Sequence, residues 1–324
     1  MSAFPKAGIA ALLLCPALAA AQSAYPHRPI RMIVPFAPGG AGDFVARILQ
    51  PSLTEILGQQ VIVENRPGAA GNIGVEVVAN ASNDGHTLLL GNIGAIAINP
   101  NLYTKFPVKP LRDLAAISQV VDVPGSVSVH PSLPVKSVPE LIAHLKSRPG
   151  QLNFGSSGGG SVNRLETELF MKRTGTSMVH VPYKGGAGAA VTGLLGNEVQ
   201  VMFITFSSAL SHTRAGRLRM LAVIAPARLN NAPEIPTMPE LGYTDLANGS
   251  WQGLYAPKET PRAVMDKLFN AAIEAMKKTD GVRRLNEGGV SVVVSRSRDD
   301  FHKFNEAENQ RFALMIREAK IEAE

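Results

Sequence analysis

The chain alternates short apolar runs with longer stretches whose apolar residues recur every three to four positions. Residues 30–34 form one such run before a glycine-rich loop, and helical spacing of apolar residues follows from Asp43 to Leu57. A further apolar run at 61–63 leads into another loop and a helical stretch near 73–81, and a third run follows at 87–90. This order of strand, loop, helix and strand predicts βαβ units on a parallel sheet.

The same order of elements begins again after an extended region at 116–129 that is interrupted by Pro124-Gly125. Strands are predicted near 152–154, 178–181, 199–204, 219–224 and 251–256, and helices near 138–147, 162–173, 189–195, 261–278 and 298–320. We therefore expect two α/β lobes. Residues 22–122 would form the first part of lobe 1 and 123–224 lobe 2, and 225–324 would contain the return crossing and complete lobe 1.

The first 21 residues have a different pattern. Lys6 precedes an apolar run from Ile9 to Leu14, and small residues follow up to Ala21. This is the layout of a cleavable secretory signal, and it is too short to span a membrane. We predict that residues 1–21 are a signal peptide and that the mature protein is periplasmic. The single cysteine, Cys15, lies in this segment, so the mature chain would have no thiol for disulfides or catalysis.

Composition excludes further classes of function. The chain has 32 basic and 26 acidic residues, and loss of Lys6 with the signal leaves 31 against 26, a net charge of +5. The basic residues are scattered and the protein is expected to be exported, so we expect no nucleic acid partner but a mild attraction for anions. The seven histidines are dispersed, and we expect no metal site and no cofactor.

Glycine-rich loops are the main candidate for binding chemistry. The stretch VPFAPGGAGD at 34–43 has an echo in VPYKGGAGAA at 181–190, and a third loop spans 155–161. A loop of this kind between a strand and a helix exposes backbone N–H groups at the helix N-terminus, where carboxylate, phosphate or sulfate binds well. The echo suggests that each lobe has one version of the same strand-loop-helix unit and that the two hold one anion between them.

Two enzyme hypotheses compete with this one. The stretch 155–159 fits the nucleophile motif G-x-S-x-G with Ser157 at its centre, and Asp245 or Asp266 with His302 could complete a triad. No HGGG-type oxyanion segment precedes it. The stretch 40–45 begins like a dinucleotide-binding loop, but Val45 fills the third small position. Both enzyme hypotheses are therefore less favoured than anion binding.

Several linked motifs resemble the Bug proteins, the extracytoplasmic solute receptors of tripartite tricarboxylate transporters. They cover nearly all of the mature chain: PFAPGG with Asp43, ENRPGAAGNIG (64–74), DGHTLL (84–89), NFGSSG (153–158), HVPYKG (180–185) and WQGLYAP (251–257). The resemblance implies a type II periplasmic-binding-protein fold, in which two α/β lobes with mostly parallel sheets surround a ligand cleft.

The family also implies a non-enzymatic, monomeric protein that captures a small carboxylated solute by lobe closure. It would deliver this solute to a membrane transporter with one large and one small subunit. A receptor that reports to a membrane sensor remains an alternative, as does a serine hydrolase that uses Ser157.

The expected ligand contacts also follow from the resemblance. They are, from the first lobe, Phe36, Ala37, Gly39, Gly40, Asp43 and Asn92, and from the second, Ser156, Ser157, Gly160, Ser161, Arg164, Tyr183 and Thr205. Asp43 is expected to cap the helix or to order the loop and its water. Two departures from the family pattern, Arg164 in place of His and Ile204 in place of Asp, would favour a di- or tricarboxylate if both side chains face the cleft.

Overall fold

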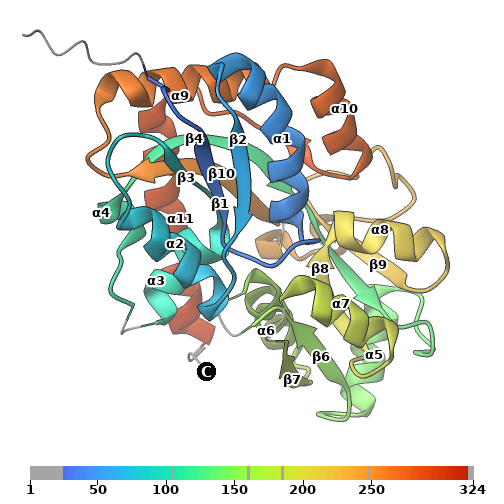
Figure 1. Cartoon of the computed structure of the whole chain (residues 1–324). Coiled ribbons are helices and arrows are strands. Elements are labelled where there is room, and N and C mark those ends of the chain that lie inside the picture. Colours follow the sequence, from blue (N-terminus) through green and yellow to red (C-terminus); the bar gives the residue numbers. More distant parts are fainter. Residues whose placement is uncertain (1–24, 104–105, 159–160, 184–185, 247–248, 320–324) are drawn as a thin grey trace, which may run out of the picture.

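The computed structural model describes residues 25–103, 106–158, 161–183, 186–246 and 249–319. The predicted signal peptide and Cys15 lie outside these residues. Two β-sheets form the centres of two lobes that lie side by side (Figure 1). Within the described residues, each helix is too short or too polar to cross a lipid bilayer.

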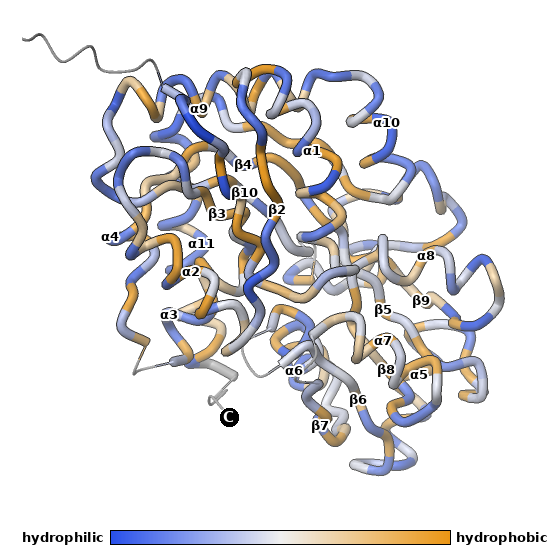
Figure 2. Tube along the Cα trace, viewed as in Figure 1, coloured by the Kyte–Doolittle hydropathy of each residue, from blue (hydrophilic) through white to orange (hydrophobic). Residues whose placement is uncertain are grey.

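The first lobe is built on a six-stranded sheet with the order β11-β4-β10-β3-β1-β2. Its strands are β1 (Ile30–Val34), β2 (Val61–Asn65), β3 (Thr87–Asn92), β4 (Leu114–Val123), β10 (Ser250–Pro257) and β11 (Ser291–Val292). Successive side chains of a strand point to opposite faces, so Met32 of β1 enters one core and Ile33 the other. Apolar residues follow the strands between the helical layers (Figure 2).

Helices cover both faces of this sheet. On one face lie α1 (Ala41–Leu57), α9 (Arg262–Ala275) and α10 (Thr279–Glu287). The other carries α2 (Asn72–Ala79), the π-helical turn η2 (Gly94–Ile98), α3 (Asn99–Leu102) and the long α11 (Arg298–Ala319). The short elements η1 (Ala69–Gly71) and α4 (Pro110–Asp113) complete the lobe. The sequence pattern did not predict α10, whose charged residues leave only Leu285 buried.

The second lobe has a five-stranded sheet with the order β7-β6-β8-β5-β9. The strands are β5 (Gly125–Val129), β6 (Asn153–Ser156), β7 (Val179–Pro182), β8 (Val201–Thr205) and β9 (Arg219–Ile224). Helices α5 (Val138–Ser147) and α6 (Val162–Thr174) cover one face, and α7 (Ala187–Leu195) and α8 (Phe206–Arg214) cover the other. Two short 3₁₀ helices, η3 (Pro239–Leu241) and η4 (Thr244–Leu246), follow β9.

The two sheets share one topology, and both are mixed rather than mostly parallel. In the first sheet β1 pairs in parallel with β2 and β3, while β10 runs antiparallel to β3 and β4. In the second, β6 pairs in parallel with β7 and β8, while β5 runs antiparallel to β8 and β9. Each sheet is therefore mixed. Its antiparallel strand, β10 in the first sheet and β5 in the second, is the one that follows a crossing of the chain between the lobes.

This topology corrects the interpretation of the echo. Strand β1 lies between two parallel partners, and its counterpart in the second sheet is β6. Strand β7, which ends in the VPYKGG stretch, lies at the edge and corresponds to β2. The counterpart of the loop at 34–43 is therefore the Ser/Gly loop after β6, and the two echoing stretches are not equivalent positions of the two lobes.

Two segments carry the chain between the lobes. Strand β4 of the first sheet continues through Pro124 into β5 of the second, and the chain returns before β10. Residues 225–246 pack with the second lobe, because Ala232 and Ile235 join one of its cores and Met238 and Leu246 the other. The predicted lobe boundaries at 122/123 and 224/225 stay predictions.

Candidate ligand-binding site

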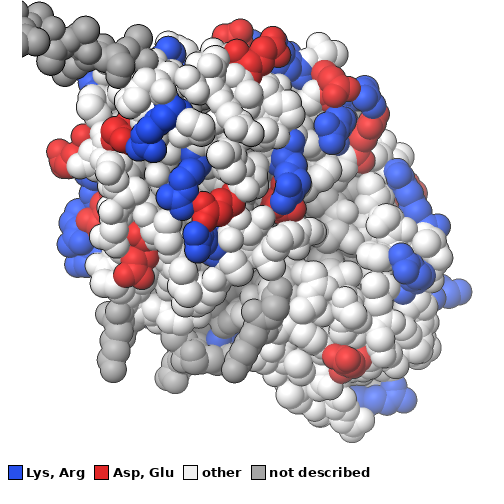
Figure 3. Space-filling model, in the orientation of Figure 1, with Lys and Arg blue, Asp and Glu red and all other residues white. Residues whose placement is uncertain are grey.

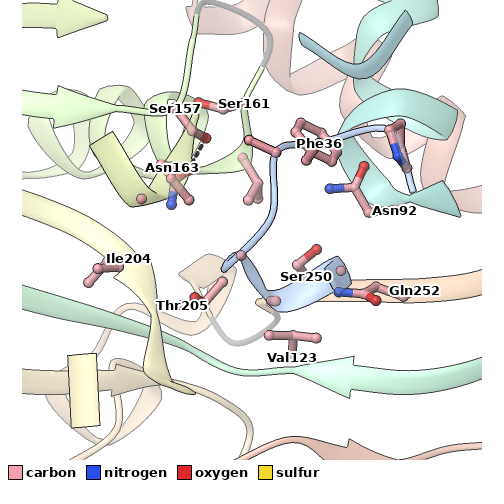
Figure 4. A pocket seen from close by; sticks show the side chains of 18 of the residues that line it. Phe36, Asn92, Val123, Ser157, Ser161, Asn163, Ile204, Thr205, Ser250 and Gln252 are labelled. Carbon is pink, nitrogen blue, oxygen red and sulfur yellow. Dashed lines mark hydrogen bonds between the residues drawn. The ribbon is translucent and has the colours of Figure 1, made fainter. Parts of the chain in front are cut away.

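A cavity of about 80 Å³ lies between the lobes, at the carboxyl ends of β1, β3, β6 and β8. This is the edge of an α/β sheet at which ligand sites commonly form. Both lobes contribute to its wall (Figure 4). Its described lining residues are Pro35, Phe36, Ala37, Gly40, Ala41, Gly42, Leu90, Asn92, Val123, Ser157, Ser161, Val162, Asn163, Ala187, Gly188, Ile204, Thr205, Ser250 and Gln252.

Four helices begin at this cavity. Gly40, Ser161 and Thr205 are the N-cap residues of α1, α6 and α8, and Ala187 is the first residue of α7. The N–H groups of a first helical turn have no partner within the helix, and each N-terminus carries roughly half a positive charge. Four such ends together offer about two positive charges and many N–H donors to an anion.

The described lining has no Lys, Arg, His, Asp or Glu side chain. On the face shown in Figure 3, few charged atoms lie in the area between the lobes. Because the described lining residues carry no side-chain charge, they would hold an anion through helix ends, hydroxyls and amides. Such a site suits an oxyanion more than a cation.

In the first lobe, Asp43 orders the loop instead of lining the cavity. Its carboxylate accepts from Gly39 N (3.1 Å) and from Arg47 Nε (3.0 Å). Burial acts to raise the pKa of Asp43, but hydrogen bonds from Arg47, Gly39 and Asn65 outweigh it and leave the pKa below its ordinary value. An ionised Asp43 thus closes the turn that presents the N-terminus of α1, which agrees with the expected role in loop order.

Asn92 ends β3 at the cavity wall. Its Oδ1 accepts from Ala95 N (3.0 Å) in the π-helical turn, so its Nδ2 remains to donate into the cavity. Phe36 lies close by, and its backbone carbonyl accepts from Asn65 Nδ2 (3.0 Å). These contacts fix the first-lobe wall before any ligand arrives.

In the second lobe, hydroxyls and one amide form a connected set. Ser157 Oγ donates to Asn163 Oδ1 (2.8 Å), and Asn163 Nδ2 donates to Phe203 O (2.5 Å). Ser161 Oγ donates to Gly158 O (2.7 Å), while Thr205 Oγ1 lies 2.8 Å from Ser208 Oγ. The side chains on this wall are thus largely satisfied by the protein itself, and the helix ends remain as its open donors.

Seven of the predicted contact residues line the cavity: Phe36, Ala37, Gly40, Asn92, Ser157, Ser161 and Thr205. Gly160 lies outside the described residues. Gly39, Asp43, Ser156, Arg164 and Tyr183 lie outside the lining. Whether any of these residues touches a ligand stays a prediction.

Three of the residues outside the lining have other partners. Ser156 is fully buried, and its Oγ lies 2.7 Å from His180 Nε2. Arg164 Nε lies 3.8 Å from Glu168 Oε1, one turn along α6. Tyr183 donates its hydroxyl to Glu198 Oε2 (2.9 Å), and burial, this hydrogen bond and the charge of Glu198 raise the pKa of Tyr183 to about 12. Arg164 lies outside the lining, so its charge gives no support for a di- or tricarboxylate ligand.

Several polar residues of the lining were not among the predicted contacts, chiefly Asn163, Ser250 and Gln252. Asn163 follows the N-cap of α6 by two residues, and its place in the first turn could have suggested it. Ser250 and Gln252 lie on β10, after the return crossing, and alternate with the buried Trp251. Ser250 and Gln252 reach the cavity because β10 pairs with β3, and the sequence pattern does not predict which strand β10 pairs with.

The candidate triad is not assembled in this structure. Ser157 bonds to Asn163, whereas Asp245 pairs with Arg173, Asp266 with Arg298, and His302 lies 3.5 Å from Glu306 on α11. Within the described residues, no group of three or more His, Cys, Asp or Glu side chains could hold a metal ion.

Comparison with known proteins decides the family. The model of the tripartite tricarboxylate transporter family receptor, TctC, matches residues 45–321. The chain belongs to this receptor family. The receptor is a solute-binding protein, not an enzyme, and its fold is that of the periplasmic binding proteins. Protein BugT of Bordetella pertussis is 40% identical to it over 295 residues, which cover 91% of this chain and 90% of BugT.

Solved structures agree with this assignment. The periplasmic binding protein BugD is 31% identical to the receptor, with a TM-score of 0.87 over 93% of this chain and all of BugD. An R. palustris protein solved with adipate is 32% identical, with a TM-score of 0.88 over 93% of this chain and all of that protein. MatC from Rhodopseudomonas palustris, solved with malate, is 28% identical, with a TM-score of 0.84 over 90% of this chain and all of MatC.

Proposed function

We propose that this receptor captures a small carboxylated solute, a di- or tricarboxylate, between its lobes and delivers it to a tripartite tricarboxylate transporter. The observation that carries the proposal is the convergence of four helix N-termini on a cavity whose described lining has no charged side chain. Roughly two positive charges from these helix ends would match the two negative charges of a dicarboxylate.

Relatives support a carboxylate over other oxyanions, since two similar proteins were solved with adipate and with malate. Closure of the lobes would remove water from the carboxylates while backbone N–H groups, hydroxyls and amides replace it. The receptor acts as a monomer in the periplasm after its signal peptide is cleaved, and it passes the solute to one large and one small membrane subunit.

A thermal-shift screen of the mature, refolded protein tests the binding step. The panel holds mono-, di- and tricarboxylates, the diamides of the same dicarboxylates, sulfate and phosphate. A ligand at 100 times its Kd stabilises the folded state by about 2.7 kcal/mol, so a true ligand raises the Tm by several degrees. Dicarboxylates should stabilise and their neutral diamides should not. Stabilisation by sulfate or phosphate alone, or by no anion, would contradict the proposal.

A further inference from the structure

A pair of primary amides forms part of the first-lobe wall of the cavity. Asn92 of β3 and Gln252 of β10 are direct partners in the antiparallel pairing of these strands, and both line the cavity. The Cβ atoms of such partners lie about 4.5–5.5 Å apart, so the two amides are neighbours on one face of the sheet. Figure 4 shows both side chains at the cavity, with Ser250 beside Gln252.

The two amides differ in how firmly they are held. The Oδ1 of Asn92 is occupied by Ala95 N, which fixes the amide and directs its NH₂ group to the cavity side. Gln252 is only 3% exposed, and its buried amide oxygen, Oε1, has no hydrogen-bond partner among the described residues. An unsatisfied buried amide oxygen is costly, so Oε1 needs a donor such as a water or a ligand hydroxyl, while the NH₂ group of the same amide can donate to a carboxylate.

The matching position of the second lobe has no such pair. Thr205 ends β8 as Asn92 ends β3, and its direct partner on β5 is Gly125, which has no side chain. On that wall Ser157 and Asn163 already bond to each other. Among the described residues, the pair of facing amides therefore lies on the first-lobe side of the cavity, which makes the two ends of a bound ligand distinguishable.

We propose that Asn92 and Gln252 together bind one carboxylate of the ligand and so select dicarboxylates over monocarboxylates. Two neighbouring NH₂ groups can each donate to one oxygen of a carboxylate without adding a charge. The other carboxylate lies at the helix N-termini of the second lobe. This inference rests on the proposed function, since it specifies which side chains bind one of the two carboxylates in that same cavity.

Isothermal titration calorimetry on the full mature protein tests the inference. The ligands are succinate, malate and adipate, each compared with the monocarboxylate of equal chain length, butyrate or hexanoate. Gln252→Met keeps the length of the side chain and removes the amide. Loss of a hydrogen bond to a charged group should lower the ratio of dicarboxylate to monocarboxylate affinity by about 10- to 100-fold.

Asn92→Asp provides a second, isosteric variant. It keeps the oxygen that accepts from Ala95 N, removes the NH₂ donors and adds a negative charge, so dicarboxylate affinity should fall by at least 100-fold. Gln119→Met is the matched control, because Gln119 is a buried amide on the neighbouring strand β4 and lies outside the cavity. The Tm of each ligand-free variant reports whether it folds.

The outcomes separate the two proposals. If wild-type protein binds dicarboxylates but Gln252→Met and Asn92→Asp leave the affinity ratio unchanged, the amide pair does not select the ligand, while the proposed function stands. An equal loss for mono- and dicarboxylates would also overturn the selection. If wild-type protein binds none of the carboxylates, the proposed function fails and the inference fails with it.

Discussion

Glu166 connects the two lobes electrostatically and predicts an unusual dependence of stability on pH. It lies on α6 of the second lobe, where α6 packs against α11 of the first. Its side chain is buried, and its Oε1 has no hydrogen-bond partner among the described residues. Burial raises the pKa of Glu166 from 4.5 to about 8, although the charge of Arg311 on α11 opposes the shift.

The direction of the pH effect on stability depends on which state of the chain, folded or unfolded, keeps the proton of Glu166. Below pH 4.5 Glu166 is protonated in both the folded and the unfolded chain; between 4.5 and about 8 only the folded chain keeps the proton. The free energy of unfolding therefore falls as pH rises through this window, by up to about 1.4 kcal/mol per pH unit. From pH 5 to pH 8 the loss amounts to about 3 kcal/mol, less than three full steps because each state titrates gradually near its own pKa.

Glu166→Gln removes this titration with little change of shape. The variant should differ little from wild type at pH 5 and be more stable by about 3 kcal/mol at pH 8. For about 300 residues at ~2.1 cal/mol/K each, this corresponds to a Tm about 5 °C higher. The assay is calorimetric melting at half-unit pH steps, with Glu274→Gln on the exposed side of α9 as control. A constant Tm difference between wild type and variant from pH 5 to pH 8 would refute the reasoning.

Two further predictions concern the site and the first sheet. Tyr183→Phe should change carboxylate affinity, measured by calorimetry, by less than about twofold, because the hydroxyl bonds to Glu198 and the residue lies outside the lining. A tenfold loss of affinity would show instead that the hydroxyl reaches the ligand. Gly253→Ala should destabilise the protein by about 1–3 kcal/mol in urea unfolding, because a Cβ there would collide with the ring of Phe301. An unchanged urea midpoint would disprove this close packing.

Local patterns predicted most strands and helices of this chain. The helices at 138–147 and 162–173 and the strand at 219–224 lie within a residue of the observed elements, because apolar periodicity reflects which face is buried. The carboxyl-end loops of β1 and β6 were also found from their glycine and serine residues. These signals depend only on neighbours in the sequence.

What the sequence could not predict depends on distant partners. The two echoing loops share local turn chemistry, but the order of strands makes β6, not β7, the counterpart of β1. Asn163 lines the cavity and the next residue, Arg164, does not, because successive residues of a helix point about 100° apart. The sequence places both residues in the first turn of α6, but it does not show which of them faces the other lobe. Gln252 reaches Asn92 only because β10 pairs with β3 across some 160 residues of chain.

The place of β10 in the first sheet also has a consequence for biosynthesis. This strand lies between β3 and β4, yet it is made after the whole second lobe. The strands of the second sheet are contiguous in the chain, and they can pair as soon as β9 has been synthesised. The first lobe begins earlier and finishes later, because its sheet has a gap until residues 250–257 arrive. The lobe that starts the chain is therefore the last whose sheet can be completed, whereas N-terminal domains usually can fold first.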